Sequence, residues 1–277
     1  MSGASALDAL DGAIIAIGAS GCETPRLDAE LLLSHVLGVS RERLIVDREL
    51  VVEGPAVRAF QSAVRRRAVE REPVAYIVGH RPFRRLELAV DRRALIPRPE
   101  TELLVEVALS MPQGMHVLDV GTGSGAVALA LKDERPDLLL TGSDLSEDAL
   151  ELARLNGERL GLEVEWLRAD LLSGVPDELD AILSNPPYVA ESARSSLAPE
   201  ILRHEPPQAL FSGPDGLVAI RALLAQVEMR DRVKVVALEV GAGQAPAVGE
   251  LMRAACFPAV RAERDLAGIE RVVVGER

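Results

Sequence analysis

The sequence of 277 residues is poor in cysteine, in aromatic residues and in basic charge. Its two cysteines, Cys22 and Cys256, lie far apart and form no CxxC pair, so we expect two free thiols in a reducing cytoplasm. Acidic residues outnumber basic ones by 43 to 31, and the net charge of −12 argues against a protein that binds nucleic acid through its phosphates. A local basic patch remains compatible with this charge.

Long apolar runs are also absent. No segment reaches the roughly 18 uninterrupted apolar residues of a membrane-spanning helix, so we expect no membrane segment. The N-terminal stretch MSGASALDALDG lacks the basic patch and apolar core of a secretory signal. The apolar content of 48% excludes a disordered chain, and the length suffices for one large or two modest domains.

Residues 1–72 show the spacing of amphipathic helices and predict a small helical domain. One apolar stripe, which ends at the stop signal Gly38, comprises Ala29, Leu32, Leu33, Val36 and Leu37. A similar stripe of Leu7, Leu10 and Ile14 lies upstream, and Pro55 opens a further helix. The polar side of that last segment holds Arg58, Arg65, Arg66, Arg67 and Arg71. Such a run is typical of a solvated helix face, with a partner contact as the alternative.

Residues 73–97 change character and predict a β-hairpin connector. Apolar residues alternate over 86–90, residues 91–93 interrupt the pattern, and a second apolar run follows at 94–96. Residues 97–102, with the sequence PRPETE, are typical of a helix start. Proline suits the first helical turn, and carboxylates suit the positive end of the helix dipole.

From residue 115 onward short apolar strands alternate with helices, within a domain that we expect to span residues 98–277. The predicted strands are 117–120, 138–141, 162–167, 181–183, 233–240, a strand around Val260, and 272–274. One predicted helix begins at residue 126, and three more cover residues 148–160, 216–228 and 244–254. This alternation predicts an α/β fold with a mostly parallel seven-stranded sheet covered on both faces. The last two strands are joined by a short turn near Gly268, so they must be antiparallel, since a parallel crossover needs a dozen or more residues.

The first of these strands ends in a glycine-rich turn, Asp119-Val-Gly121-Thr-Gly123-Ser-Gly125. Glycines let the backbone turn tightly and approach a ligand, and the N-terminus of the following helix points N–H groups toward it. The pattern is GxGxG rather than the GxGxxG of dinucleotide folds, so a pyrophosphate is not the expected ligand. Asp144 ends the second strand, where a carboxylate can accept both hydroxyls of a ribose; the alternative is a helix N-cap. Together these features predict a nucleoside-bearing cofactor without phosphates.

Two further aspartates belong to the same edge of the predicted sheet. Asp170 follows the third strand, where such folds contact an adenine, and its alternative is a loop aspartate that caps a turn. Asp119 is expected to lie beneath the glycine turn and support it. The residues that we assign to the cofactor are Gly121, Thr122, Gly123, Ser124, Gly125, Asp144, Asp170, Leu171 and Asn185.

The fourth strand ends in Asn185-Pro186-Pro187-Tyr188, and two prolines cannot continue a central strand. Ligands of open α/β sheets bind beyond the carboxyl ends of the strands, so we expect this tetrapeptide to face the cofactor. The side-chain oxygen of Asn185 and the carbonyl of Pro186 are two acceptors, and Pro187 offers no competing N–H. Tyr188 adds a flat face for stacking. The combination predicts a holder for a planar NH₂ group conjugated to a π-system; the alternative is a Pro-Pro loop whose Asn caps its own turn.

These motifs resemble those of the class I S-adenosylmethionine-dependent methyltransferases, which have a Rossmann-like fold, and within them the HemK/PrmC family of release-factor glutamine methyltransferases. The similarity covers nearly the whole chain, through DAELLLSHVLG, YIVGHRPF, IPRPETE, LDVGTGSG, SNPPY, HEPPQALFSGPDGL, LEVGAGQ and DLAGIERVVVG. NPPY alone is shared with adenine-N6 and cytosine-N4 DNA methyltransferases, whereas IPRPETE and EPPQALFSGPDGL are more specific. The chain departs from the family at Leu171 and Leu172, where an aromatic residue is expected after Asp170.

The resemblance implies S-adenosylmethionine as the cofactor and class-1 peptide-chain release factors as cytoplasmic partners. The reaction it implies is methylation of the side-chain amide nitrogen of the glutamine in their Gly-Gly-Gln motif. Asn185 and Pro186 would be the catalytic pair and, with Pro187 and Tyr188, would bind the substrate amide. The helical domain would recognise the release factor, and neither nucleic acid nor a membrane is an expected partner. The four histidines show no triad or metal spacing, so we predict no metal; they are His35, His80, His116 and His204.

Three alternatives remain open at this point. The first is methylation of adenine N6 in DNA, which needs a basic cleft that the net charge disfavours. The second is methylation of a glutamine of a large-subunit ribosomal protein, which differs only in the PRPET context and the N-terminal region. The third is a nucleotide-binding module without catalysis, which the intact NPPY beside an intact glycine turn disfavours.

Overall fold

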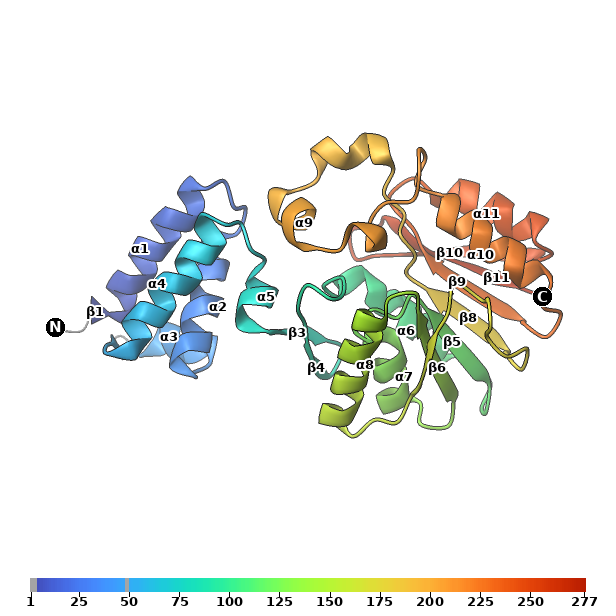
Figure 1. Ribbon diagram of the computed structural model, residues 1–277, viewed down its shortest axis with the longest axis horizontal. Helices are drawn as coiled ribbons and strands as arrows, with labels where there is room; N and C mark the ends of the chain where they lie inside the picture. The colour runs from blue at the N-terminus through green and yellow to red at the C-terminus, as the bar shows by residue number, and fades with distance from the viewer. Residues whose placement is uncertain (1–3, 48–49) are drawn as a thin grey trace. The chain divides into compact units, whose positions relative to one another are not determined.

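The computed structural model describes residues 4–47 and 50–277 and contains two compact units (Figure 1). The first unit is the chain up to Gly79 together with Ala198–His204. The second unit is His80–Leu197 and Glu205–Arg277. A short segment that lies late in the sequence therefore belongs to the N-terminal unit.

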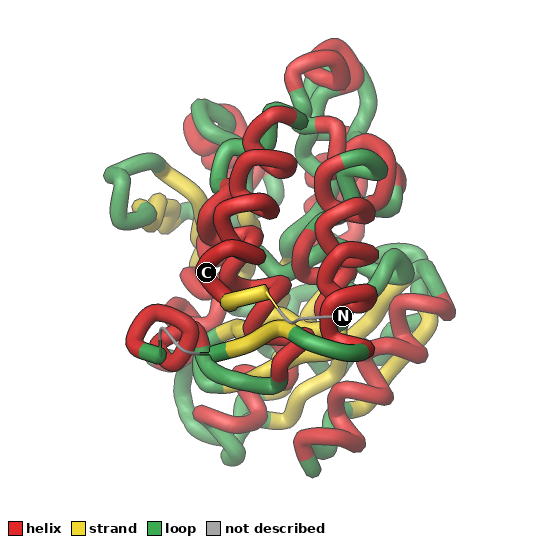
Figure 2. The backbone as a smooth tube through the Cα atoms, turned by 90° about the vertical axis from the view of Figure 1, so that its left-hand side faces the viewer, coloured by secondary structure: helices red, strands yellow, loops and turns green. Residues whose placement is uncertain are grey.

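Helices build the first unit, and Figure 2 draws them in red. Its elements are β1 (Ala4–Ser5), α1 (Ala6–Ala19), α2 (Pro25–Leu37), α3 (Arg41–Val46), β2 (Val51–Val52), α4 (Pro55–Ala68), α5 (Val74–Val78) and α9 (Pro199–His204). Helices α1, α2 and α4 pack against one another, and β1 pairs antiparallel with β2. Proline begins α2 and α4, where its missing N–H costs nothing, and Gly38 ends α2 in the left-handed conformation. The predicted helical region is thus present, with the short β1–β2 pair added.

The buried side of α1 differs from the predicted stripe. Leu10 is buried as expected, whereas Leu7 is 56% exposed. The residues of α1 that face the core are Ala6, Leu10, Ala13 and Ile17. Their spacing follows the helical period, and Leu7 points about 100° away from Ala6 because each residue turns the helix by that angle. The pattern failed because two of the core positions are alanines, which a search for large apolar residues overlooks.

The arginine run of α4 is only partly a solvated face. Arg58 and Arg65 are exposed, but Arg67 is 6% exposed and Arg71 is half-buried. Arg67 Nε donates to Asp28 Oδ2 of α2 at 2.6 Å. The prediction of a solvated face is therefore wrong for Arg67 and Arg71, which are internal partners of carboxylates.

The second unit is built on a seven-stranded sheet, as predicted, with strand order β10-β11-β9-β8-β5-β6-β7. Its strands are β5 (His116–Val120), β6 (Leu139–Asp144), β7 (Glu165–Arg168), β8 (Ala181–Ser184), β9 (Val235–Glu239), β10 (Ala259–Arg264) and β11 (Glu270–Glu276). Strands β5 to β9 are parallel to one another. β11 pairs antiparallel with both β9 and β10, which confirms the predicted antiparallel ending.

Helices cover both faces of this sheet. The helical segments are η1 (Pro99–Thr101), α6 (Glu102–Leu109), α7 (Ala126–Glu134), α8 (Glu147–Leu160), η2 (Glu191–Ser196), η3 (Pro207–Ala209), α10 (Val218–Glu228) and α11 (Ala245–Ala254). Ile182 of β8 belongs to a core with α10 and α11, whereas its neighbours Ala181 and Leu183 belong to a core with α6 and α7. Side chains alternate across a strand, so these are the two faces of one sheet. None of the described helices is long and apolar enough to cross a membrane.

Strands β3 (His80–Phe83) and β4 (Leu86–Ala89) pair antiparallel and form a β-hairpin. The alternation over 86–90 therefore marks a strand, as predicted, but its partner precedes it in the chain. Residues 94–96 form no strand. They are an extended segment of buried and half-buried side chains beside the cavity described next, which explains their apolar character.

Candidate active site

A cavity of about 790 Å³ opens at the carboxyl ends of β5, β6 and β8, where Val120, Asp144 and Ser184 line it. The strand order reverses at this place, because the chain runs outward from β5 to β6 and β7 and then returns to β8 on the other side of β5. Such switch points are where open α/β sheets bind ligands. The cavity therefore lies where the sequence predicted it.

The glycine turn forms the floor of this cavity. Gly121, Gly123 and Gly125 have φ values of 70°, 58° and 82°, a region that residues with a Cβ rarely adopt. A Cβ added at Gly125 would lie 2.9 Å from the ring of Trp166, and one at Gly142 would lie 2.4 Å from the same ring. The only tryptophan of the chain thus packs against glycines of β6 and of the turn, and this packing requires that they lack side chains.

Asp119 supports the turn from below, as expected. Thr122 Oγ1 donates to Asp119 Oδ2 at 2.6 Å, and the N–H of Thr122 donates to the carbonyl of Ser143 at 2.9 Å. Burial raises the pKa of Asp119 to about 6, although hydrogen bonds from Thr122 and from the backbone of Ala128 lower it. The carboxylate is used within the protein, which is consistent with a structural role.

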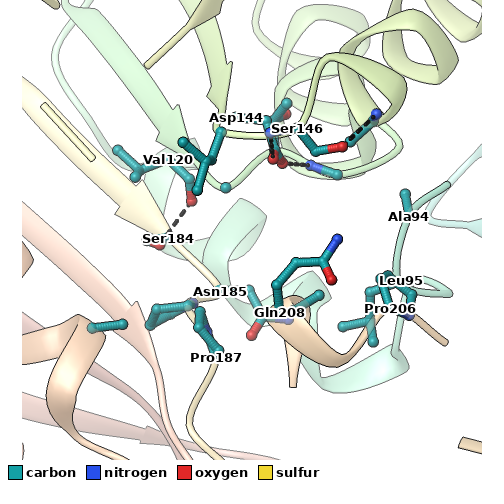
Figure 3. A pocket seen from close by; sticks show the side chains of 18 of the residues that line it. Ala94, Leu95, Val120, Asp144, Ser146, Ser184, Asn185, Pro187, Pro206 and Gln208 are labelled. Atoms are coloured by element: carbon teal, nitrogen blue, oxygen red, sulfur yellow. Dashed lines mark hydrogen bonds between the residues drawn. The ribbon is translucent and has the colours of Figure 1, made fainter. Parts of the chain in front are cut away.

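Asp144 lies at the end of β6, on the side of the cavity that Figure 3 shows opposite Asn185. Its Oδ2 accepts from the N–H of Gly123 and its Oδ1 from the N–H of Ser146, both at 2.9 Å. The N-cap of α8 is Ser146, whose Oγ accepts from the N–H of Ala149, so the alternative of an N-cap at Asp144 is wrong. Burial raises the pKa of Asp144 despite these backbone donors. Each of its oxygens retains a second lone pair, so the ribose role stays a prediction.

Asp170 and Leu171 also line the cavity, immediately beyond β7. The carbonyl of Asp170 accepts from the N–H of Ser173 in a tight turn, and Leu171 has a φ of 53°. Leu172 instead is buried in the core of the α10 side. Leu171 therefore stands at the cavity wall where the family pattern places an aromatic residue. The adenine contact of both lining residues stays a prediction.

The side-chain amide of Asn185 is held from behind by a chain of hydrogen bonds. Asn185 Nδ2 donates to Thr101 Oγ1 at 3.1 Å, and Thr101 Oγ1 donates to Glu239 Oε2 at 2.6 Å. Neither Asn185 Oδ1 nor the carbonyl of Pro186 accepts a hydrogen bond from any residue in the described part of the chain. Pro187 follows in the cavity wall (Figure 3). Two acceptors are therefore available at the predicted place.

Tyr188 is placed differently from the other three residues of its motif. It is not among the residues that line the cavity, and its hydroxyl donates to Glu239 Oε1 at 3.3 Å. Its carbonyl accepts from Gln244 Nε2 at 3.0 Å, and a Cβ at Gly216 would lie 2.2 Å from that same carbonyl oxygen. The structure therefore brings Asn185, Pro186 and Pro187 together at the cavity and uses Tyr188 behind them; substrate stacking on Tyr188 stays a prediction.

Family models match both parts of the chain, the PrmC N-terminal domain over residues 8–79 and the methyltransferase small domain over residues 99–244. A release factor glutamine methyltransferase of Rhodospirillum rubrum is 40% identical over 263 residues, which cover 93% of this chain and 81% of the relative. One of Cereibacter sphaeroides is 40% identical over 272 residues and covers 97% of each chain. The chain belongs to the release factor glutamine methyltransferase family. The resemblance seen in the sequence is thus confirmed.

A solved structure with little sequence identity has a similar fold. The catalytic domain of hMettl16 in complex with MAT2A 3'UTR hairpin 6 has a TM-score of 0.56 and 14% identity, and the match covers 80% of this chain and 81% of that one. At this identity the match concerns the fold alone. It confirms the class I methyltransferase architecture, with its mixed seven-stranded sheet.

S-adenosylmethionine is the cofactor of this class of enzyme, and the cavity fits it. Among the described residues that line the cavity, the charged ones are the three carboxylates of Asp119, Asp144 and Asp170 and the guanidinium of Arg93. Such a lining suits sugar hydroxyls and a cationic sulfonium and disfavours phosphates, in agreement with the absence of a GxGxxG pattern. No group of three or more metal-ligating side chains occurs within residues 4–47 and 50–277.

Three residues that contribute to the site were not assigned to it from the sequence. Thr101 appeared only as part of a helix start, and Glu239 only as a residue within the predicted strand 233–240. The third is Gln208, whose amide projects into the cavity in Figure 3. A signal existed for Glu239, because an acidic residue that ends an apolar strand at the ligand edge of a sheet needs a partner there.

The segment that carries Gln208 is fixed to the residues that follow the hairpin. Glu205 is 3% exposed, and its Oε1 accepts from Arg98 Nη2 at 2.5 Å. Its Oε2 accepts from the N–H of Ile96 at 3.3 Å. Residues 94–97 and 206–209 form one side of the cavity wall, so this ion pair joins the family motifs IPRPETE and EPPQALFSGPDGL there.

Proposed function

We propose that this chain methylates the side-chain amide nitrogen of the glutamine in the Gly-Gly-Gln motif of class-1 peptide-chain release factors. Membership of the family supports the reaction, because its curated relatives carry the name release factor glutamine methyltransferase. The match to the PrmC N-terminal domain, which covers residues 8–79, supports the choice of substrate over other methyl acceptors. Release factors act in translation, so the proposed place of action is the cytoplasm.

One observation supports this function best, namely the two free acceptors at the end of β8. Asn185 and Pro186 line the cavity, and neither Asn185 Oδ1 nor the carbonyl of Pro186 accepts from a protein donor in the described chain. A primary amide carries two N–H groups, and two acceptors match them. Because neither acceptor can donate, the pair selects an NH₂ group and disfavours a carboxylate, which discriminates glutamine from glutamate.

The chemical difficulty is that an amide nitrogen is a poor nucleophile, since its lone pair is delocalised into the carbonyl. The bound cofactor supplies a methyl group activated by a positive sulfonium. Asn185 and Pro186 accept the two N–H hydrogens, which keeps electron density on the nitrogen and fixes its direction. No histidine lines the cavity in the described residues, and we infer that the amide proton leaves to water after transfer.

The residues proposed to hold the cofactor are those of the opposite cavity wall. The glycine turn would allow close approach of the cofactor to the backbone at residues 121–125, and Asp144 would accept the ribose hydroxyls. Asp170 and Leu171 would contact the adenine. The helical N-terminal unit is proposed to recognise the release factor, with no direct nucleic-acid contact and no membrane contact.

Purified protein and labelled S-adenosylmethionine test this proposal. Label is expected in a class-1 release factor, and replacement of the Gly-Gly-Gln glutamine by alanine should abolish it. A large-subunit ribosomal protein and DNA are offered in parallel reactions. Label that appears only in the ribosomal protein, or only in DNA, would replace the proposed substrate by that alternative.

A further inference from the structure

The polarity of the Asn185 amide is determined by its neighbours. A threonine hydroxyl has one hydrogen, and that of Thr101 points to Glu239 Oε2 at 2.6 Å. Toward Asn185, 3.1 Å away, the same hydroxyl can therefore only accept. Asn185 must turn its NH₂ group to Thr101, which leaves its oxygen free for the cavity.

Glu239 is the end of this chain of hydrogen bonds, and few groups around it can stabilise its negative charge. Its carboxylate is 1% exposed and accepts from two neutral hydroxyls, those of Thr101 and Tyr188. Glu100 of η1 adds a second negative charge nearby, and Arg271 of β11 is a cation that acts on it from a distance without a direct ion pair. Burial raises the pKa of Tyr188, with a further increase from the charge of Glu239, so Tyr188 remains a donor.

We propose that Thr101 and Glu239 are positioning residues for methyl transfer, and that they orient the Asn185 amide so that its oxygen faces the substrate nitrogen. This inference rests on the proposed role of Asn185 as an acceptor. It assigns a purpose to the PRPET motif beyond the start of α6, since that motif places the Thr101 hydroxyl between the strand ends of β8 and β9.

The protonation state of Glu239 should determine whether the Asn185 amide keeps this orientation. Burial raises the pKa of Glu239 to about 7, although the hydrogen bonds from Thr101 and Tyr188 and the charge of Arg271 lower it. A protonated Glu239 can donate to Thr101 Oγ1, which frees the Thr101 hydrogen to point at Asn185. The amide is then free to turn its NH₂ group toward the cavity, where it would oppose the N–H groups of the substrate. Turnover should therefore rise as the pH increases through about 7.

The first test compares a replacement of Thr101 that removes its hydroxyl with one that retains it. Thr101→Val removes the hydroxyl and should reduce kcat about 10- to 100-fold, with the Kd for S-adenosylmethionine changed less than about 2-fold. Thr101→Ser retains the hydroxyl and should restore most of kcat. Ser110→Ala removes a hydroxyl that bonds Val107 at the other end of α6 and serves as the control. Wild-type turnover in Thr101→Val would overturn the proposal.

The second test is the pH profile of kcat for the wild type and for Glu239→Gln. The wild type should show an inflection near pH 7, and Glu239→Gln should lose it, because a glutamine does not titrate. An unchanged inflection in Glu239→Gln would also overturn the proposal. Should Thr101→Val fail to fold, as judged by circular dichroism, this profile decides alone.

The test of the positioning role can be distinguished from the test of the proposed substrate. If the wild type labels the ribosomal protein or DNA instead of the release factor, the proposed function fails, and the same variants are measured on the substrate that is labelled. A loss of kcat in Thr101→Val and rescue by Thr101→Ser would then still support the positioning role. Equal turnover of the wild type, Thr101→Val and Thr101→Ser on that substrate would refute the positioning role.

Discussion

Two clusters of buried polar side chains, one in each unit, differ in charge. In the N-terminal unit, Arg67 contacts Asp28 and Glu200, and Arg71 Nη2 donates to Glu200 Oε2 at 2.6 Å. Two carboxylates there meet two guanidiniums. In the second unit Glu239 meets only the hydroxyls of Thr101 and Tyr188 by direct hydrogen bonds.

The difference separates a structural cluster from a functional one. Burial alone would lower the pKa of Arg67, but the carboxylates of Asp28 and Glu200 outweigh it and raise that pKa. Around Glu239 burial dominates, and the pKa rises to about 7. Removal of one partner from a buried ion pair is strongly destabilising, because it leaves a buried charge without compensation, whereas an uncompensated buried carboxylate already costs stability while it is intact. We therefore expect mutations in the first cluster to lower stability, and mutations in the second to lower turnover without lowering stability.

Removal of a charge from the balanced cluster should have the largest effect on stability. Arg67→Met leaves the buried Asp28 without its guanidinium and should lower the free energy of unfolding of the N-terminal unit by about 3–5 kcal/mol. Scanning calorimetry would detect this as a lower melting temperature. Arg65→Met is the matched control, because Arg65 lies on the same helix with its side chain 74% exposed and should change stability very little. Equal melting temperatures for the two variants would remove the distinction between the clusters.

Asn185→Ala should have the largest effect on turnover. The variant loses one of the two acceptors for the amide N–H groups, so kcat should fall about 10²- to 10³-fold. The melting temperature should change little, and the Kd for S-adenosylmethionine, measured by calorimetry, should change only modestly. Unaltered turnover would contradict the assigned role of Asn185.

Glu239→Gln should stabilise the protein at high pH while it slows the reaction. The folded-state pKa of Glu239 is raised from 4.5 to about 7, so the unfolding free energy contributed by this group is highest below pH 4.5 and is lost as the pH rises through about 7. The loss corresponds to about 3 kcal/mol at pH 8, and the uncharged glutamine avoids it. Denaturant unfolding at pH 5 and pH 8 should show a variant that gains on the wild type as the pH rises. A difference that does not depend on pH would mean that folding does not raise the pKa of Glu239 above its unfolded value.

The smallest expected effect concerns Asp144, a half-buried carboxylate whose hydrogen-bond donors are neutral backbone N–H groups. Asp144→Ala removes the proposed ribose acceptor and should raise the Kd for S-adenosylmethionine about 10-fold, by calorimetry. Asp144→Asn retains one acceptor oxygen and should bind with an intermediate affinity. Ser146→Ala, which removes the true N-cap of α8, should lower stability by about 1 kcal/mol and leave the affinity nearly unchanged. If the Kd of Asp144→Ala equals that of the wild type, the ribose is held elsewhere.

Sequence reasoning recovered the elements whose signals are local. Alternation of apolar strands with helices gave the parallel sheet, and the turn near Gly268 gave the antiparallel ending, because short connections allow no other pairing. The glycine turn and the Asn185 strand end were located from their residue types alone. The β-hairpin was predicted, but not the strand His80–Phe83, because Pro82 and the charged residues around it resemble a loop.

Contacts between residues distant in the sequence could not be predicted. Thr101 and Glu239 are separated by more than a hundred residues, and nothing local to either indicates that their oxygens lie 2.6 Å apart. The same holds for Arg67 and Glu200, so the arginine run looked like a solvated face. In both cases a polar residue had a satisfactory local explanation, and only the packing of the fold reveals a partner.

The segment Ala198–His204 has a consequence for how this protein can be divided. It is inserted in the sequence of the catalytic unit, yet Glu200 is an ion-pair partner of Arg67 and Arg71, and His204 Nε2 lies 2.9 Å from the carbonyl oxygen of Glu70. A gene fragment that begins at His80 would therefore encode a catalytic unit in which α9 lacks its packing partners. The complementary fragment, which ends at Gly79, would leave Arg67 and Arg71 without the carboxylate of Glu200. Exchange of the N-terminal unit between relatives thus requires three junctions in the gene, one after Gly79 and two that flank Ala198–His204. A swap of the first 79 residues alone would combine Arg67 and Arg71 of one protein with residue 200 of another.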